Sequence, residues 1–174
     1  DPQDTHSLSH NTVRAIHEDR LGVLWIGTDG GGLNRLDRGS DRFVHYQHDP
    51  QDPHSLSHNT VRAIHEGRAG VLWIGTDGGL DEFDRSGQRF VHHRADPGAL
   101  HNLSNDNVTS ICEDRSSTLW VGTNGGGLNR FDRASGRFVH YRTGRSDPGS
   151  LGDRYDVSTD PNSLSNNYVK SIYE

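Results

Sequence analysis

Residues 25–37 read WIGTDGGGLNRLD, and this stretch returns as WIGTDGGLDEFD at 73–84 and as WVGTNGGGLNRFD at 120–132. The spacing is regular, because Trp25, Trp73 and Trp120 lie 48 and 47 residues apart. A fixed period of about 20–50 residues is the signature of a chain built from stacked structural units. The sequence therefore contains three copies of one unit, and YVKSIYE at 168–174 begins a fourth.

Each unit contains four short runs that are separated by turn residues. In the first unit the runs are VRAIHE at 13–18, VLWIGT at 23–28, GLNRLD at 32–37 and RFVHYQ at 42–47. Their length and their β-branched and aromatic content are typical of strands, and the Asp-Gly tips are typical of hairpins. No window shows the apolar spacing of a helix. Four strands in a unit of about 48 residues predict one blade of a β-propeller.

We therefore expect an all-β chain of β-propeller blades, each with four antiparallel strands, comprising three full blades and the first strand of a fourth. The predicted boundaries are 1–12 for an N-terminal loop, 13–60, 61–107 and 108–142 for blades one to three, 143–167 for an inserted loop, and 168–174 for the first strand of blade four. Propellers usually have about four to eight blades. The chain is thus expected to be part of a longer propeller or a subunit that other copies complete.

Composition excludes several classes of function. With 18 Lys and Arg against 24 Asp and Glu, the net charge is −6, which argues against a nucleic-acid partner. No apolar run is long enough to insert into a membrane. The single cysteine, Cys112, cannot form an intrachain disulfide.

The units and the segments before them, SLSHNTVRAIHED, SLSHNTVRAIHEG and NLSNDNVTSICED, resemble the two-component regulator propeller repeat. The resemblance implies a propeller in the extracytoplasmic sensor half of a bacterial hybrid histidine kinase, or in another surface or secreted protein. It brings no catalytic residues. The second unit departs from the pattern, because it lacks one glycine after Trp73 and carries Asp81 and Glu82 where the other units carry Asn and Arg.

Motifs for chemistry are weak. The two HSLSH pairs, His6 with His10 and His54 with His58, are spaced so that imidazoles could meet at a metal, but they are copied with the unit, and the third unit reads HNLSN. Solvated loop histidines are the favoured interpretation. The GTDGGG tips precede a strand rather than a helix and contain no lysine, so they predict hairpins rather than phosphate loops. We expect no enzyme activity, no cofactor and no metal.

Binding residues are expected on one rim of the blades. Because strands alternate in direction, the second-to-third connection and the connection to the next blade emerge on the same side, and loops on a rigid scaffold tend to carry binding residues. The insertion 143–156 breaks the repeat, so it either contributes to binding or is an ordinary surface loop. The candidate ligand-binding residues are Asp29, Asp77, Asn124, His10, His58, Asn105, Arg145, Arg154 and Tyr155. The residues expected in the core between blades are Trp25, Trp73, Trp120, Ile16, Ile64 and Ile111.

Two functional hypotheses follow. The first is a non-catalytic propeller module that forms the ligand- or partner-binding part of an extracytoplasmic sensor, with an extracellular small molecule or glycan as ligand. The second is a structural module whose copies assemble head to tail into rings or filaments, since exposed blade faces and strand edges readily associate. The expected partners are other blades of a longer chain or other copies of this one.

Overall fold

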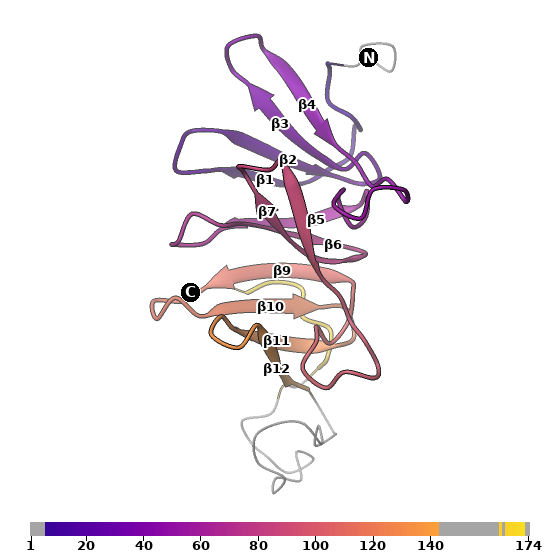
Figure 1. Ribbon diagram of the computed structural model, residues 1–174, viewed down its shortest axis with the longest axis vertical. Coiled ribbons are helices and arrows are strands. Elements are labelled where there is room, and N and C mark those ends of the chain that lie inside the picture. The colour runs from indigo at the N-terminus through magenta and orange to yellow at the C-terminus, as the bar shows by residue number, and fades with distance from the viewer. Residues whose placement is uncertain (1–5, 143–163, 165, 173–174) are drawn as a thin grey trace, which may run out of the picture.

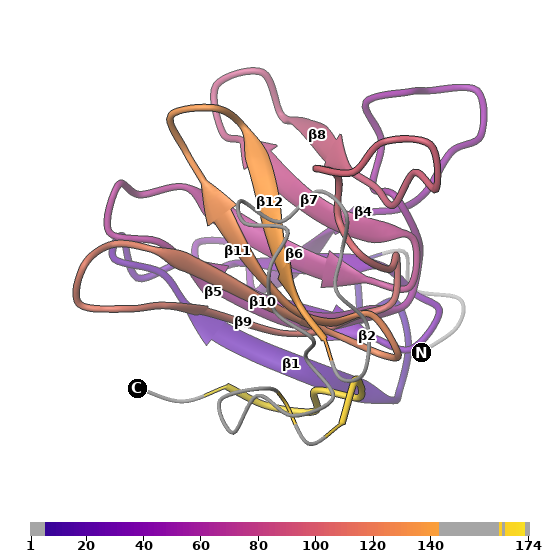
Figure 2. The same ribbon diagram turned by 90° about the horizontal axis from the view of Figure 1, so that it is seen from below.

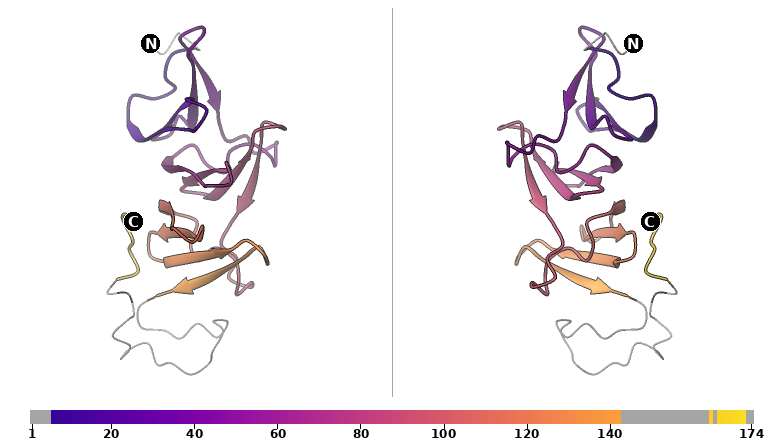
Figure 3. Two further views of the ribbon diagram at one scale, coloured as in Figure 1. Left: turned by 90° about the vertical axis from the view of Figure 1, so that its left-hand side faces the viewer. Right: turned by 90° about the vertical axis from the view of Figure 1, so that its right-hand side faces the viewer.

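The computed structural model describes residues 6–142, 164 and 166–172. Twelve strands form three four-stranded antiparallel sheets, and these residues contain no helix (Figure 1). The sheets are stacked along the long axis of the molecule (Figures 1 and 3). The prediction of all-β propeller blades is confirmed.

In each blade the strands follow one another in chain order across the sheet. Blade one contains β1 (Val13–Glu18), β2 (Leu24–Thr28), β3 (Leu33–Asp37) and β4 (Arg42–Tyr46). Blade two contains β5 (Val61–Glu66), β6 (Leu72–Thr76), β7 (Gly79–Asp84) and β8 (Arg89–His93). Blade three contains β9 (Val108–Glu113), β10 (Leu119–Thr123), β11 (Gly127–Asp132) and β12 (Arg137–Tyr141). The first strands, β1, β5 and β9, lie side by side at one edge of the stack (Figure 2).

Tryptophan and phenylalanine side chains fill the space between neighbouring blades. Trp25 packs with Leu72, Ile74 and Phe83 of blade two, and Trp73 makes the equivalent contacts with blade three. A glycine in the second strand allows the first strand of the next blade to approach: a Cβ at Gly27 would lie 2.5 Å from a Val61 methyl carbon. Apolar burial between blades is thus the main source of stability in this fold.

The segment from residue 166 to residue 172 contacts blade three where a fourth blade would begin. The carbonyl oxygen of Asn167 accepts hydrogen bonds from the amides of Gly125 and Gly127 at 3.1 and 2.8 Å, just as that of Asn59 accepts them from Gly30 and Gly32 at 3.1 and 2.8 Å. Residues 168–172 form no strand, only a bridge between Tyr168 and Asn124. The first strand of a fourth blade, expected over 168–174, is thus reduced to this bridge within the described residues.

The predicted core residues fall into two groups. Trp25 and Trp73 are each 1% exposed, and Ile64 and Ile111 are half-buried, as expected for residues between blades. The prediction that Ile16 is buried is wrong, because its side chain is 66% exposed. Trp120 is only half-buried. Ile16 lies on the outer face of blade one and Trp120 on the outer face of blade three, so no neighbouring sheet of the described chain covers them.

Candidate functional site at the inner edge of the blades

A polar hollow of about 560 Å³ lies along the edge formed by the first strands. Every described blade contributes to it, as does the segment after the insertion. Side chains alternate along a strand, so in β5 and β9 the first residue, Val61 or Val108, is fully buried in the blade junction and the next residue reaches the hollow. In β1 both Val13, which is 40% exposed, and Arg14 line the hollow. The lining residues are Thr12, Val13, Arg14, Arg62, Asn107, Thr109, Asn124 and Lys170. We call this surface the inner-edge hollow.

Two ion pairs line the hollow in blades one and two. Arg14 donates to the Asp29 carboxylate at 2.6 Å, and Arg62 donates through both Nε and Nη2 to Asp77, with 2.9 Å for the Nη2 bond. The hydrogen bond from Arg14 lowers the pKa of Asp29, and the one to Asp77 raises the pKa of Arg62. These side chains are partly exposed to solvent, so a ligand can reach both charges.

The third blade replaces this ion pair by neutral groups. Thr109 stands in the place of the arginine and Asn124 in the place of the aspartate, so neither change leaves a lone charge. The Thr109 hydroxyl donates to the carbonyl oxygen of Gly122 at 3.0 Å. The inner-edge hollow is therefore charged at blades one and two and neutral at blade three.

The side-chain oxygen of Asn107 receives no hydrogen bond from the described residues. Its Nδ2 donates to Asp77 at 2.6 Å, which fixes the orientation of the amide, and its Oδ1 is buried without a hydrogen-bond partner. A buried acceptor of this kind is uncommon and costs stability. The side chain of Lys170 adds an ammonium group to the hollow.

Of the predicted rim residues, some reach the hollow and others serve the turns. Asn124 lines the hollow, and Asp29 and Asp77 border it through their ion pairs. His10, His58 and Asn105 each accept a hydrogen bond from the backbone amide two residues later, at 3.1, 3.0 and 2.9 Å. Their side chains therefore stabilise the loop before each first strand. The remaining three candidates, Arg145, Arg154 and Tyr155, lie outside the described residues.

Sequence reasoning missed the residues that contribute most to the hollow: Arg14, Arg62, Thr109, Asn107 and Lys170. A signal was present, because the second residue of the first strand is basic in units one, two and four. This pattern lies on a strand, whereas binding residues were expected on loops. The described residues contain no group of three or more His, Cys, Asp or Glu arranged to hold a metal ion. The absence of a metal at the HSLSH pairs stays a prediction.

Comparison with known proteins supports the architecture. The sequence model described as two component regulator propeller matches residues 7–30, 55–78 and 102–125. A comparison with curated proteins found no match. Among solved structures, the extracellular domain of a protein described as a hybrid two-component system from Bacteroides thetaiotaomicron is 31% identical, with a TM-score of 0.70 over 77% of this chain and 19% of that one.

Two further structures share the fold. The extracellular domain of a protein described as a one-component system from B. thetaiotaomicron is 20% identical, with a TM-score of 0.73 over 99% of this chain and 20% of that one. Virginiamycin B lyase from Staphylococcus aureus is 15% identical, with a TM-score of 0.55 over 74% of this chain and 40% of that one. At these identities the likeness establishes the fold alone.

The chain covers about a fifth of each of the two extracellular domains. Within the described residues, no helix is long and apolar enough to cross a membrane. Each matched segment runs from the loop before a first strand to the glycine tip after the second strand, and it recurs once in every blade. The chain is therefore built from repeats of the two-component regulator propeller family.

Proposed function

We propose that this chain is part of the ligand- or partner-binding propeller of an extracytoplasmic sensor, and that the inner-edge hollow is the binding surface. The observation that carries the proposal is a polar hollow to which all three blades contribute. Its residues differ between blades, whereas the tryptophan and phenylalanine contacts of the junctions repeat. The likeness to extracellular domains of bacterial regulatory systems supports the setting.

The chemistry of the hollow favours a polar ligand that carries acidic groups. Arg14 and Arg62 each have a carboxylate partner, but Lys170 has none among the described residues. Lysine and arginine bind acidic groups. A small acidic molecule or a glycan with carboxylate groups fits this set. Such groups bind and orient a ligand, so we propose binding rather than catalysis.

A double substitution tests the site. Thr109→Arg with Asn124→Asp would rebuild in blade three the ion pair found in blades one and two, and would fill the neutral part of the hollow. Isothermal titration with a panel of neutral and uronic-acid-containing oligosaccharides should show binding by the wild-type chain and its loss in the double variant. Arg38→Ala, at an exposed turn of blade one, is the control and should bind normally. Binding that survives the double substitution would overturn the site, and no binding to the panel would overturn the ligand class.

A specific observation also supports the second candidate function, self-assembly. At the first junction, Arg85 of blade two donates to Asp19 of blade one at 2.8 Å and to Glu66 of its own blade at 3.0 Å. At the second junction, Arg133 donates to Glu113 at 2.8 Å. The two glutamates are almost fully buried, at 6% and 2% side-chain exposure. At each junction, the later blade in the chain thus supplies a glutamate and an arginine that are paired with each other.

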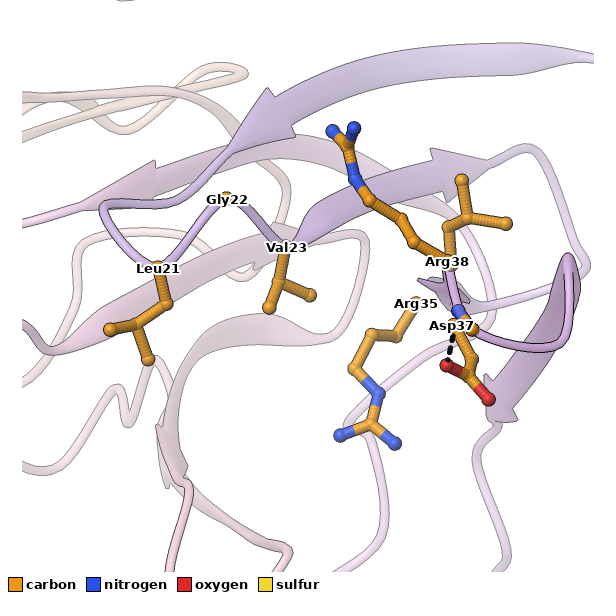
Figure 4. Close-up of a pocket in the computed structure, with 8 residues that line it drawn as sticks. Leu21, Gly22, Val23, Arg35, Asp37 and Arg38 are labelled. Atoms are coloured by element: carbon orange, nitrogen blue, oxygen red, sulfur yellow. Dashed lines mark hydrogen bonds between the residues drawn. The ribbon is translucent and has the colours of Figure 1, made fainter.

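Each end of the stack presents one half of such a junction. Blade one carries the equivalent pair, Glu18 and Arg38, at 3.0 Å and about 60% exposed. Arg38 also lines a hollow of about 370 Å³ between two turns, shown with Leu21 and Arg35 in Figure 4. Blade three carries Trp120, whose indole donates to Asp114 at 2.8 Å. Trp25 donates to Asp19 in the same way at 2.9 Å, and Asp19 is the residue that Arg85 of the next blade binds. The outer faces of blade one and blade three therefore carry the two complementary halves of a junction.

We propose as this second candidate that copies stack head to tail, with Arg38 of one copy on Asp114 of the next. Sedimentation velocity should show association by the wild-type chain, and Arg38→Glu or Asp114→Arg alone should abolish it. A mixture of these two variants should associate again in alternating order, because every contact between unlike variants joins opposite charges, whereas identical variants place like charges together. A wild-type chain that is monomeric at every concentration, or variants that associate like it, would overturn the candidate.

A further inference from the structure

Blade two contains a buried carboxylate where the other blades contain an amide. Asp81 on β7 takes the place of Asn34 and Asn129, and its side chain is fully buried. One carboxylate oxygen accepts from the backbone amide of Ser57 at 2.9 Å. The other lies 2.7 Å from Nδ1 of His92, the residue paired with Asp81 in the sheet. An unneutralised charge at such a site would be costly.

The imidazole of His92 has an acceptor at each end. Its Nε2 lies 2.9 Å from the carbonyl oxygen of Pro53, and its Nδ1 lies beside the Asp81 carboxylate. A carbonyl oxygen can only accept, so both hydrogen bonds together need two protons shared among the ring and the carboxylate. A neutral histidine next to an ionised aspartate supplies one. The observed contacts therefore belong to the state that holds the additional proton.

The histidines that correspond to His92 in the other blades do not need this additional proton. His45 and His140 also contact a carbonyl oxygen of the preceding loop, those of Ser7 and Asn102, at 2.7 and 2.6 Å. In those blades the buried partner is an uncharged asparagine. Only blade two, among the described blades, couples the loop contact to a buried charge.

Other charged groups around His92 are few. Arg94 lies just past the end of β8 and acts against its protonation. The loop that packs on the ring carries Asp49, Asp52 and His54, and the two carboxylates accept from backbone amides of their own loop, both at 2.9 Å. Asp81 thus provides the dominant interaction, and the hydrogen bond to it raises the pKa of His92.

We propose that His92 and Asp81 form a proton-dependent clamp that holds the loop from Asp49 to Ser57 on blade two. When the additional proton leaves, one of the two contacts of the ring is lost, and the buried carboxylate loses its cationic partner. The loop continues directly into Asn59, whose carbonyl oxygen binds the glycine tip of blade one, and then into the first strand with Arg62. Release of the clamp loosens the connection between blades one and two near the inner edge.

The sign of the pH effect follows from the raised pKa. Below the ordinary histidine pKa of about 6.5, the clamp contributes its full stabilisation. That stabilisation is lost as pH rises through the pKa of His92 in the folded chain. The loop is therefore tight in acidic medium and loosens in alkaline medium.

Nuclear magnetic resonance of the imidazole rings tests the proposal in the wild-type chain. We expect His92 to titrate above about 6.5, and the amide of Ser57 to exchange faster, after correction for the intrinsic rate, once His92 loses its proton. Asp81→Asn should lower the pKa of His92 and remove the pH dependence of the loop. This variant should fold, because Asn34 makes the corresponding bond to Ser9 at 3.0 Å.

A transplant provides the matched control. Asn129→Asp in blade three would place a buried carboxylate in the position that Asp81 holds, and should confer pH-dependent amide exchange on Ser104, which now donates to Asn129 at 2.9 Å. A His92 that titrates at or below the ordinary value, or loop exchange that is independent of the charge on His92, would overturn the clamp. Since no ligand is involved, this result is independent of the proposed binding function.

Discussion

Replacing Trp25 by phenylalanine should destabilise the chain more than the same change at Trp73. Both indoles are 1% exposed. Each packs edge-on against a phenylalanine of the next blade, with ring centroids 5.4 and 5.6 Å apart, and each has an arginine 5.9 Å from the ring centroid. The loss of packing is therefore nearly the same at the two sites.

The difference lies in the indole nitrogen. Trp25 donates to the buried carboxylate of Asp19 at 2.9 Å, whereas Nε1 of Trp73 is buried with no hydrogen-bond partner among the described residues, because Gly67 stands where the other blades carry an aspartate. A hydrogen bond to a charged group contributes about 1.5–3 kcal/mol. Trp25→Phe should thus lower the free energy of unfolding by about 2 kcal/mol more than Trp73→Phe.

Urea unfolding followed by circular dichroism measures both losses, and equal slopes show that the unfolded states are comparable. In an Asp19→Ala background, Trp25→Phe should cost no more than Trp73→Phe, because the acceptor is gone. Equal losses in the wild-type background, or a larger loss at Trp73, would refute the assignment of the extra stability to the indole bond.

Three further predictions concern the junctions. Gly75→Ala should lower the free energy of unfolding by about 1–3 kcal/mol in urea titrations, because the new Cβ would lie 2.6 Å from a Val108 methyl carbon. Trp73→Ala should cost about 3–5 kcal/mol and Trp120→Ala distinctly less by the same assay, because Trp120 is only half-buried. Burial alone would raise the pKa of Asp19, but the hydrogen bonds from Trp25 and Arg85 outweigh it and lower that pKa. The melting temperature should therefore fall as pH drops below about 3.9, and less steeply in Asp19→Asn.

The repeated pattern explains why the strands could be predicted. The run at 13–18 coincides with β1, and the runs at 23–28 and 32–37 differ from β2 and β3 by one residue at their start. A single short apolar run is ambiguous between strand and helix. Three aligned copies remove the ambiguity, because turn glycines and apolar positions recur together.

The candidate site was harder to predict, for two physical reasons. A polar residue that recurs in a turn has the same sequence signature whether it contacts a ligand or its own backbone, and His10 and His58 contact the backbone. The hollow itself depends on strand register, because Arg62 reaches it through the alternation of a first strand whose valine, Val61, is buried in the junction. One sequence shows the alternation but not which side of the strand remains open.

The departures of single units show which contacts can change independently. In blade three, Thr109 and Asn124 replace an arginine and an aspartate together, so the hollow changes while the junction through Gly122 keeps its close approach to the next segment. In blade two, Gly67 removes the acceptor of Trp73, yet a Cβ at this position would lie 2.4 Å from the Glu113 carboxylate. At the first junction Arg85 binds the corresponding two carboxylates, Asp19 and Glu66, so an aspartate at position 67 would require the Glu113 side chain to shift. Changes at the inner edge do not disturb the packing between blades, and this is the physical reason to expect ligand specificity there.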